Sequence, residues 1–275
     1  KNWFFCSYRV ANKATMTKTV LRYPGGKSRA VEHIVAKLPP SDVYVSPFFG
    51  GGAIELYLAG VLNKKVIAND KFEPLTNFWR CLKVDAARVH EEVLKLHPIT
   101  KDMFIECRGI VCDMSICDFL RAAAYFALNR SSFSGATLSG GFSKEAAKKR
   151  FNRSAIDRLL GVNLCNIEFY NMDFKDFMSA YGNAGVVYLD PPYALEKGSN
   201  KLYGKNGDMH DAFDHEGLRD MLLGGQISKP WVMSYNNSDV IKEMYVMDGI
   251  GIEEATWSYG MNKSKKSSEI LIMKT

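Results

Sequence analysis

The segment from Asp42 to Asp70 constrains the fold of this chain more than any other feature. Its first part, DVYVS at 42–46, is a β-rich run that ends at Pro47, and KVIA at 65–68 is a second run, followed by Asn69 and Asp70. Between them lie a glycine turn and an apolar segment with helical rhythm, residues 53–62. The order strand, glycine turn, helix, strand, acidic residue is typical of a βαβ half of a doubly wound sheet.

The rest of the chain predicts an α/β core interrupted by a helical insertion. Further strands are expected at 167–170, 185–189, 231–234 and 269–273, whereas helical patterns dominate between them and the first unit, at 75–82, 85–96 and 118–128. We therefore expect residues 16–74 and 166–275 to form the core domain that carries the active site, with an insertion at 75–165. The basic segment 1–15 precedes Met16 and lacks a long apolar stretch, so we expect it to be a leader outside the core.

Composition limits the possible settings of the protein. Thirty-six Lys and Arg against thirty Asp and Glu give a net charge of +6, which permits a polyanionic partner without requiring one. No apolar stretch approaches the roughly 18 residues of a membrane span. The six cysteines form no C-x-x-C pair and the histidines do not cluster near them, so we expect no metal site and a reducing, cytoplasmic location.

The glycine turn Phe49-Gly50-Gly51-Gly52 follows the first strand directly. Glycines let the backbone turn tightly and approach a ligand, and the following helix directs its positive end toward that ligand. Asp70, about twenty residues further on, stands where a carboxylate can accept hydrogen bonds from ribose hydroxyls. Turn and acid together favour an adenosine-containing cofactor, although a tight turn alone would also require the glycines.

A second motif, YPGGKS at 23–28, invites comparison with a phosphate-binding loop. That motif needs a glycine five residues before Gly26, and Leu21 occupies the position. The nucleotide triphosphatase interpretation therefore fails on spacing. What remains is a loop that caps a helix expected at 29–38, with Lys27 solvated.

The third motif, VVYLDPPY at 186–193, is the most specific. An apolar strand ends in Asp190, and two prolines then fix the chain without offering backbone N–H groups. Asp190 and the Pro191 carbonyl can accept hydrogen bonds from an exocyclic amine, and Tyr193 offers a ring on which a planar base can stack. An Asp-Pro-Pro turn that merely ends a strand is the structural alternative.

Taken together, YPGGK, PFFGGG, Asn69-Asp70, Asp173-Phe174 and DPPY resemble the D12 class of N6-adenine DNA methyltransferases. The resemblance runs from about Arg22 to the C-terminus. It implies a Rossmann-like methyltransferase core that depends on S-adenosylmethionine, with an insertion carrying a β-hairpin near residues 129–135. Ser234-Tyr235-Asn236 and the segment 265–269 also resemble the family.

The resemblance assigns expected roles to particular residues. The cofactor site would comprise Tyr23, Lys27, Phe49, Gly50, Gly51, Gly52, Asp70, Asp173 and Phe174. The catalytic site would comprise Asp190, Pro191, Pro192 and Tyr193, which would hold an adenine flipped out of double-stranded DNA. The DNA contacts would come from Asn129, Arg130, Phe133, Ser134, Lys144, Lys148, Lys149 and Arg150, of which the basic run could also be an ordinary solvated face.

One departure concerns the target sequence. Relatives that methylate GATC carry a basic residue a few positions after the hairpin glycine and an Asn before it, whereas this chain has SGATL at 134–138. The expected reaction survives this difference, but GATC is not a safe expectation for the target. The oligomeric state stays open, and pairing with a restriction endonuclease is one possible role.

Other activities remain as alternatives. An N4-cytosine DNA methyltransferase has similar geometry, but its motif more often begins with Ser than with Asp. An RNA or protein methyltransferase accounts less well for a basic, hairpin-bearing insertion. An inactive DNA-binding protein with a decayed methyltransferase core conflicts with the intact Asp70, Asp173 and Asp190.

Overall fold

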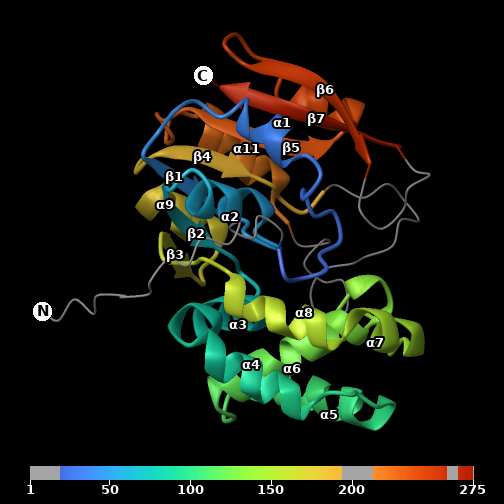
Figure 1. Cartoon of the computed structure of the whole chain (residues 1–275). Coiled ribbons are helices and arrows are strands. Elements are labelled where there is room, and N and C mark those ends of the chain that lie inside the picture. The colour runs from blue at the N-terminus through green and yellow to red at the C-terminus, as the bar shows by residue number, and fades with distance from the viewer. Residues whose placement is uncertain (1–18, 194–212, 259–265, 275) are drawn as a thin grey trace, which may run out of the picture.

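Parallel strand pairing organises the core of the protein. The computed structural model describes residues 19–193, 213–258 and 266–274, and within them one sheet of seven strands has the order β3-β2-β1-β4-β5-β7-β6 (Figure 1). The strands are β1 (Val43–Ser46), β2 (Lys65–Asn69), β3 (Ile167–Tyr170), β4 (Val186–Leu189), β5 (Trp231–Asn236), β6 (Gly251–Ser258) and β7 (Lys266–Lys274). The first five are mutually parallel, whereas β7 runs antiparallel to both β5 and β6.

The strand order reverses at β1, which pairs with β2 on one side and β4 on the other. Such a reversal opens a crevice at the carboxyl ends of the two central strands, where ligands bind in doubly wound folds. The expected Rossmann-like α/β core is therefore confirmed.

Helices cover both faces of the sheet because the central strands are apolar on both sides. On β4, Val186 and Tyr188 pack into the cluster that contains α1 (Val31–Val35) and α2 (Ala53–Gly60). Val187 and Leu189 point the other way, into a second cluster with α9 (Phe174–Tyr181), α11 (His215–Leu223) and α12 (Asp239–Met244). This continuous apolar pattern is what a sheet buried on both faces requires.

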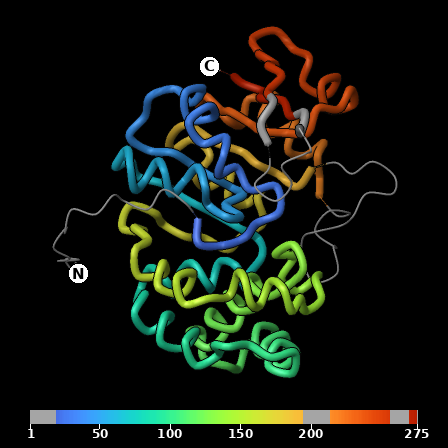
Figure 2. Tube along the Cα trace, turned by 45° about the vertical axis from the view of Figure 1, so that its right-hand side comes forward, coloured from blue at the N-terminus to red at the C-terminus, as the bar shows by residue number. Residues whose placement is uncertain are grey.

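The chain between β2 and β3 is helical. It comprises α3 (Glu73–Val84), α4 (Ala86–Lys95), α5 (Lys101–Cys112), α6 (Asp118–Ser131), α7 (Lys144–Arg150) and α8 (Arg153–Asp157), with short 3₁₀ turns at Phe133–Gly135 and Arg158–Gly161. These helices gather below the sheet in both views (Figures 1 and 2). Helix α6 is buried from Arg121 to Ser131 and contacts α3, α4, α5 and α7, so it forms the centre of the bundle.

One apolar cluster continues from the α1/α2 face of the sheet into this bundle. The insertion is thus packed onto the core through shared side chains. The division of the chain at residues 75 and 165 stays a prediction, and the leader at 1–15 lies outside the described residues. None of the helices that the structure describes is both long and apolar enough to cross a membrane.

The hairpin expected in the insertion is a loop rather than a pair of strands. A single antiparallel bridge joins Ser132 to Phe142, and Phe133 N–H donates to the Gly141 carbonyl. Between these ends, Ser134, Gly135 and Thr137 have left-handed backbone, so regular strand pairing cannot continue through the loop.

A buried carboxyl group joins β1 to α2. Glu55, in the first turn of α2, accepts a 2.6 Å hydrogen bond from the Ser46 hydroxyl at the end of β1, and both residues are buried. Burial raises the pKa of Glu55 to about 8, against the lowering effect of its hydrogen bonds. At neutral pH this side chain is therefore mainly a neutral acid.

This pKa predicts how stability depends on pH. Between pH 4.5 and 8 the unfolded chain releases the Glu55 proton and the folded chain keeps it, so this group lowers stability as the pH rises, by at most about 1.4 kcal/mol per pH unit. Glu55→Gln removes the ionisation and should gain stability relative to the wild type as the pH rises from 5 to 8. Urea unfolding at several pH values measures this difference, and a constant difference would contradict a raised pKa.

Candidate active site

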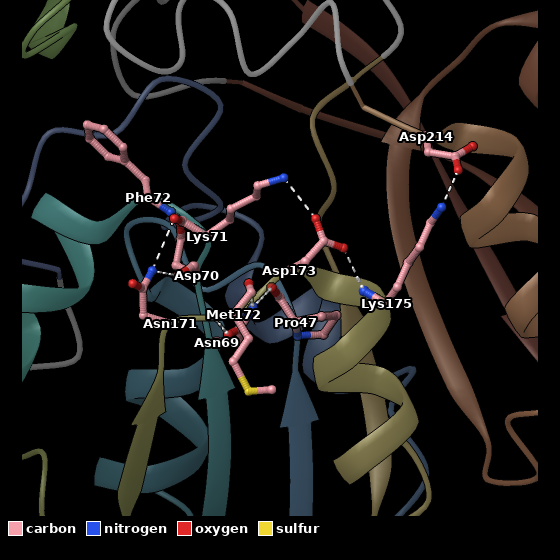
Figure 3. Close-up of polar contacts among 10 residues, drawn as sticks. All are labelled: Pro47, Asn69, Asp70, Lys71, Phe72, Asn171, Met172, Asp173, Lys175 and Asp214. Carbon is pink, nitrogen blue, oxygen red and sulfur yellow. Dashed lines mark hydrogen bonds and ion pairs between the residues drawn. The ribbon is translucent and has the colours of Figure 1, made fainter.

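The segments that follow four parallel strands meet at one edge of the sheet, and three of them carry an aspartate. The parallel strands β1, β2, β3 and β4 are followed, within three residues, by Pro47, Asp70, Asp173 and Asp190, respectively. Figure 3 shows the first three of these segments above the carboxyl ends of their strands. Because all four strands run the same way, the motifs that the sequence placed at strand ends share one edge.

Asn69, the last residue of β2, links the loops at this edge through its side chain. Its side-chain amide donates to the carbonyls of Pro47 and Met172, at 3.1 Å each, and its oxygen accepts from Met172 N–H at 2.9 Å (Figure 3). The side chain is buried. It therefore fixes the loops after β1 and β3 to the end of β2.

The glycine turn is needed because side chains approach it closely. Gly50 and Gly52 have φ of 51° and 67°, in the left-handed region, and a Cβ on Gly50 would lie 2.9 Å from the Tyr23 ring. A Cβ on Gly52 would lie 2.4 Å from the ring of Phe49. Tyr23 thus lies against the turn, and the buried Phe49 supports the turn from inside, edge-on to Trp79. A role of either residue in cofactor binding stays a prediction.

Asp70 ties the end of β2 to the glycine turn. Its two carboxylate oxygens accept hydrogen bonds from Gly50 N–H at 2.8 Å and Phe72 N–H at 2.9 Å. Burial raises the pKa of Asp70 to about 6, although both hydrogen bonds oppose the rise. A largely ionised acceptor therefore stands beside the turn at neutral pH.

Asp173 begins α9 as its N-cap, with one oxygen accepting from Lys175 N–H. Its other oxygen accepts from Lys71 Nζ at 2.8 Å, so the loops after β2 and β3 are joined by charge (Figure 3). The next residue, Phe174, packs against Phe48 and Phe213, with ring centroids 5.7 and 5.1 Å away. These three rings form an apolar wall beside the acidic residues.

Asp190 is the centre of a charged network. Lys27 Nζ donates to both of its oxygens, at 2.8 and 3.0 Å, and also to the Gly25 carbonyl at 2.9 Å. The Ser234 hydroxyl donates to Asp190 Oδ1 at 3.0 Å and the Tyr193 hydroxyl at 3.2 Å. Lys27 is buried, while Asp190 keeps a quarter of its side chain exposed.

The residues after Asp190 are held by β5. Pro191 is buried, and the Pro192 carbonyl accepts a 3.4 Å hydrogen bond from the Tyr235 hydroxyl. The rings of Tyr193 and Tyr235 stack with centroids 5.2 Å apart and planes 20° from parallel. One face of Tyr193 is thereby supported by the sheet.

Two residues expected to contact DNA lie inside the protein. Asn129 is fully buried and exchanges hydrogen bonds with the backbone N–H and carbonyl of Arg22, at 2.8 Å each. Arg130 is also buried, with its guanidinium donating to the Arg150 carbonyl at 3.0 Å. This corrects the expectation for both: they attach α6 to neighbouring segments, and the apolar content of α6 draws their side chains inward.

The other predicted DNA residues lie at the surface. Phe133 is 72% exposed, Ser134 is half-buried in the loop, and Lys144, Lys148, Lys149 and Arg150 are exposed on α7. Lys149 forms an ion pair with Glu145 one turn away. The structure thus places an exposed aromatic ring and a basic helix on the two sides of the Ser132–Phe142 bridge.

Sequence reasoning assigned no role to several residues of the network around Asp190. Glu269 on β7 accepts from the Tyr193 hydroxyl at 3.1 Å, and Ser234 on β5 bridges Asp190 and the Tyr188 hydroxyl. The pairing of Asn236 with Glu269 between β5 and β7 brings them together. The sequence signal for them was the family resemblance of Ser234-Tyr235-Asn236 and of the segment 265–269, which assigned neither residue a role.

Known proteins resemble this chain across most of its length. Residues 23–261 match the family model described as "D12 class N6 adenine-specific DNA methyltransferase". A DNA N-6-adenine-methyltransferase of Escherichia phage P1 is 28% identical over 89% of this chain, and the match spans a third of the phage protein. The type II methyltransferase M.MjaIII of Methanocaldococcus jannaschii is 27% identical over 64% of this chain and 69% of its own.

A DNA adenine methylase of Salmonella typhi is 24% identical over 93% of this chain and 95% of its own length. Among solved structures, an rRNA methylase from Streptococcus thermophilus aligns with 90% of this chain and 94% of its own at 10% identity, with a TM-score of 0.33. The family match covers the glycine turn, the acidic strand ends and the DPPY segment. This chain belongs to the D12 class of N6 adenine-specific DNA methyltransferases.

Proposed function

We propose that this protein transfers a methyl group from S-adenosylmethionine to the N6 amine of an adenine flipped out of double-stranded DNA. The observation that carries the proposal is the Asp190 carboxylate, partly exposed at the point where the strand order reverses and next to a supported tyrosine ring. The family assignment gives the same reaction.

The residues at the sheet edge fit the methyl donor. Asp70 offers a carboxylate to ribose hydroxyls, and the ring wall of Phe48, Phe174 and Phe213 offers an apolar surface to a planar base. The left-handed glycine turn leads into α2, whose N-terminal backbone dipole favours a carboxylate group. When bound, S-adenosylmethionine supplies an electrophilic methyl group on a sulfonium.

The residues of this chain would prepare the nucleophile. An adenine amine is weakly nucleophilic because its lone pair is delocalised into the ring. A hydrogen bond from N6 to Asp190, with a second to the Pro191 carbonyl, draws the nitrogen toward tetrahedral geometry, and stacking on Tyr193 orients the base. N6 then forms the bond to the methyl carbon as the carbon–sulfur bond breaks, and the amine loses one proton to water.

The test is a methylation assay on mixed-sequence duplex DNA with isotopically labelled S-adenosylmethionine, followed by mass spectrometry of the nucleosides. We expect labelled N6-methyladenine from the wild type. Asp190→Ala should abolish the label and leave the affinity for S-adenosylhomocysteine within about threefold, because Asp190 acts on the base. Labelled N4-methylcytosine would overturn the base assignment, and undiminished turnover by Asp190→Ala would overturn the role of the carboxylate.

The pKa of Asp70 predicts the pH dependence of cofactor binding. Its ionised form accepts hydrogen bonds from hydroxyls, and that form is lost as the pH falls through about 6. The affinity for S-adenosylhomocysteine, measured by calorimetry, should therefore fall by up to about tenfold between pH 7 and pH 5. Asp70→Asn should bind more weakly with little pH dependence, and an equally steep profile in this variant would contradict the assignment.

We further propose that DNA binds across the Ser132–Phe142 loop and α7. Phe133 is a large, exposed apolar ring at the start of the loop, suited to insertion beside an extruded base. Four arginines also lie near one another: burial lowers the pKa of Arg130 to about 9, and the positive charges of Arg158, Arg22 and Arg150 add to this shift. The exposed lysines of α7 extend this positive region toward solvent.

Salt dependence tests this DNA face. Neutralising Lys148, Lys149 and Arg150 together should reduce the slope of log Kd against log salt by about 2 to 3, because each lost phosphate contact releases one fewer counterion. The matched control is Lys65→Gln, which removes an exposed charge at the amino end of β2. An unchanged slope in the triple variant would move the DNA contacts elsewhere.

Pairing with a restriction endonuclease in a bacterial or viral cytoplasm is the finer part of the proposal. It draws on the archaeal relative named as a type II methyltransferase. Protection of DNA methylated by this enzyme against cleavage by a candidate endonuclease is the corresponding test.

A further inference from the structure

Glu269 brings a second buried carboxylate to the proposed catalytic site. It lies on β7 opposite Asn236 of β5, and only 1% of the residue is exposed. Its Oε2 accepts a 3.1 Å hydrogen bond from the Tyr193 hydroxyl and lies 3.8 Å from Lys27 Nζ. Lys27 therefore stands between two carboxylates that come from different parts of the sheet.

The Lys27 ammonium occupies the acceptors that the target amine needs. It donates to both oxygens of Asp190, and Oδ1 also accepts from Ser234 and Tyr193. Oδ1 already accepts from three donors, so N6 must donate to Oδ2, to which Lys27 also donates. The positive charge of Lys27 opposes the charge that develops on N6, so the amine is served best when Lys27 leaves this oxygen. A buried ammonium left without a carboxylate would be strongly unfavourable.

We propose that Glu269 is a positioning residue that receives Lys27 when the target amine binds Asp190. This inference rests on the proposed function. Shortening the 3.8 Å separation to the roughly 2.8 Å of a charge-assisted hydrogen bond needs a small movement of a long side chain. The Tyr193 hydroxyl can follow, because it lies 3.2 Å from Asp190 and 3.1 Å from Glu269 and can donate its proton to either.

Glu269 also sets the sign of the local charge. Within the part of the chain that the structure describes, Asp190 and Glu269 share the single ammonium of Lys27, which leaves this group of three with one net negative charge. During transfer the positive charge of the sulfonium moves to N6, before the amine releases its proton to water. A negative site favours that charge where the transition state develops it.

The consequence of neutralising Glu269 follows from both roles. Without its charge, Lys27 would stay on Asp190 and oppose the incoming amine. Glu269→Gln should therefore lower the single-turnover methylation rate by about tenfold or more, while the affinity for S-adenosylhomocysteine stays at the wild-type value. Glu253→Gln is the matched control, because Glu253 on β6 pairs with Lys37 and His33 away from Asp190.

A double-mutant cycle separates this role from mere support of the fold. Lys27→Met removes the ammonium that Glu269 receives and should retain measurable methylation. Adding Glu269→Gln should then lower the rate by clearly less than the tenfold expected in the wild-type background, because only the effect of the local charge remains. Rate losses that multiply, a Lys27→Met variant without detectable methylation, or a Glu269→Gln variant at the wild-type rate would each overturn the inference. Absence of any DNA methylation by the wild type would instead overturn the proposed function, and this inference with it.

Discussion

The pairing of β1 with β2 on one side and with β4 on the other is the constraint on which the site depends. Parallel pairing sends every following loop to the same edge, so Asp70, Asp173 and Asp190 meet although they are far apart in sequence. Register matters as well, because a slip of one residue would reverse which side chains of β4 face α2 and which face α9. The buried apolar residues on both faces of the strand prevent such a slip.

The insertion is connected to this edge by more than proximity. Asn129 at the end of α6 holds the backbone of Arg22, and Arg22 directly precedes Tyr23, which packs on the glycine turn. The loop that begins at Phe133 leans on the same segment, since a Cβ on Gly135 would lie 2.7 Å from the Arg22 carbonyl. A movement of the loop on binding DNA would therefore shift the backbone at Tyr23 and, four residues later, at Lys27.

The sequence was sufficient to predict this edge because its motifs stand directly after apolar runs. DPPY after VVYL and Asp70 after KVIA could only meet at one edge once the strands were parallel. It was not sufficient for residues whose role depends on packing in three dimensions. Asn129 and Arg130 look like surface groups in a polar stretch, yet the apolar turns before them bury the end of α6.

The role of Glu269 and the existence of β6 were not predicted, for related reasons. Residues 251–258 include two adjacent glutamates and no apolar run, because β6 is an edge strand that pairs only with β7. Glu269 enters the site through the antiparallel register of β7 on β5, which no local pattern encodes. Tertiary pairing decides the position of both, so propensity and periodicity carry little information about them.

The acids near this edge have different partners. Glu55 accepts a hydrogen bond from a neutral hydroxyl, and burial keeps it protonated. Asp190 instead contacts the Lys27 ammonium at 2.8 Å, and Glu269 Oε2 lies 3.8 Å from the same ammonium. If Glu55 were ionised as well, a further negative charge would repel Asp190 and Asp70 from below. A neutral Glu55 therefore leaves the negative charge at Asp190, where the amine must bind, and among the described residues Lys27 fixes how much of that charge is accessible before the base arrives.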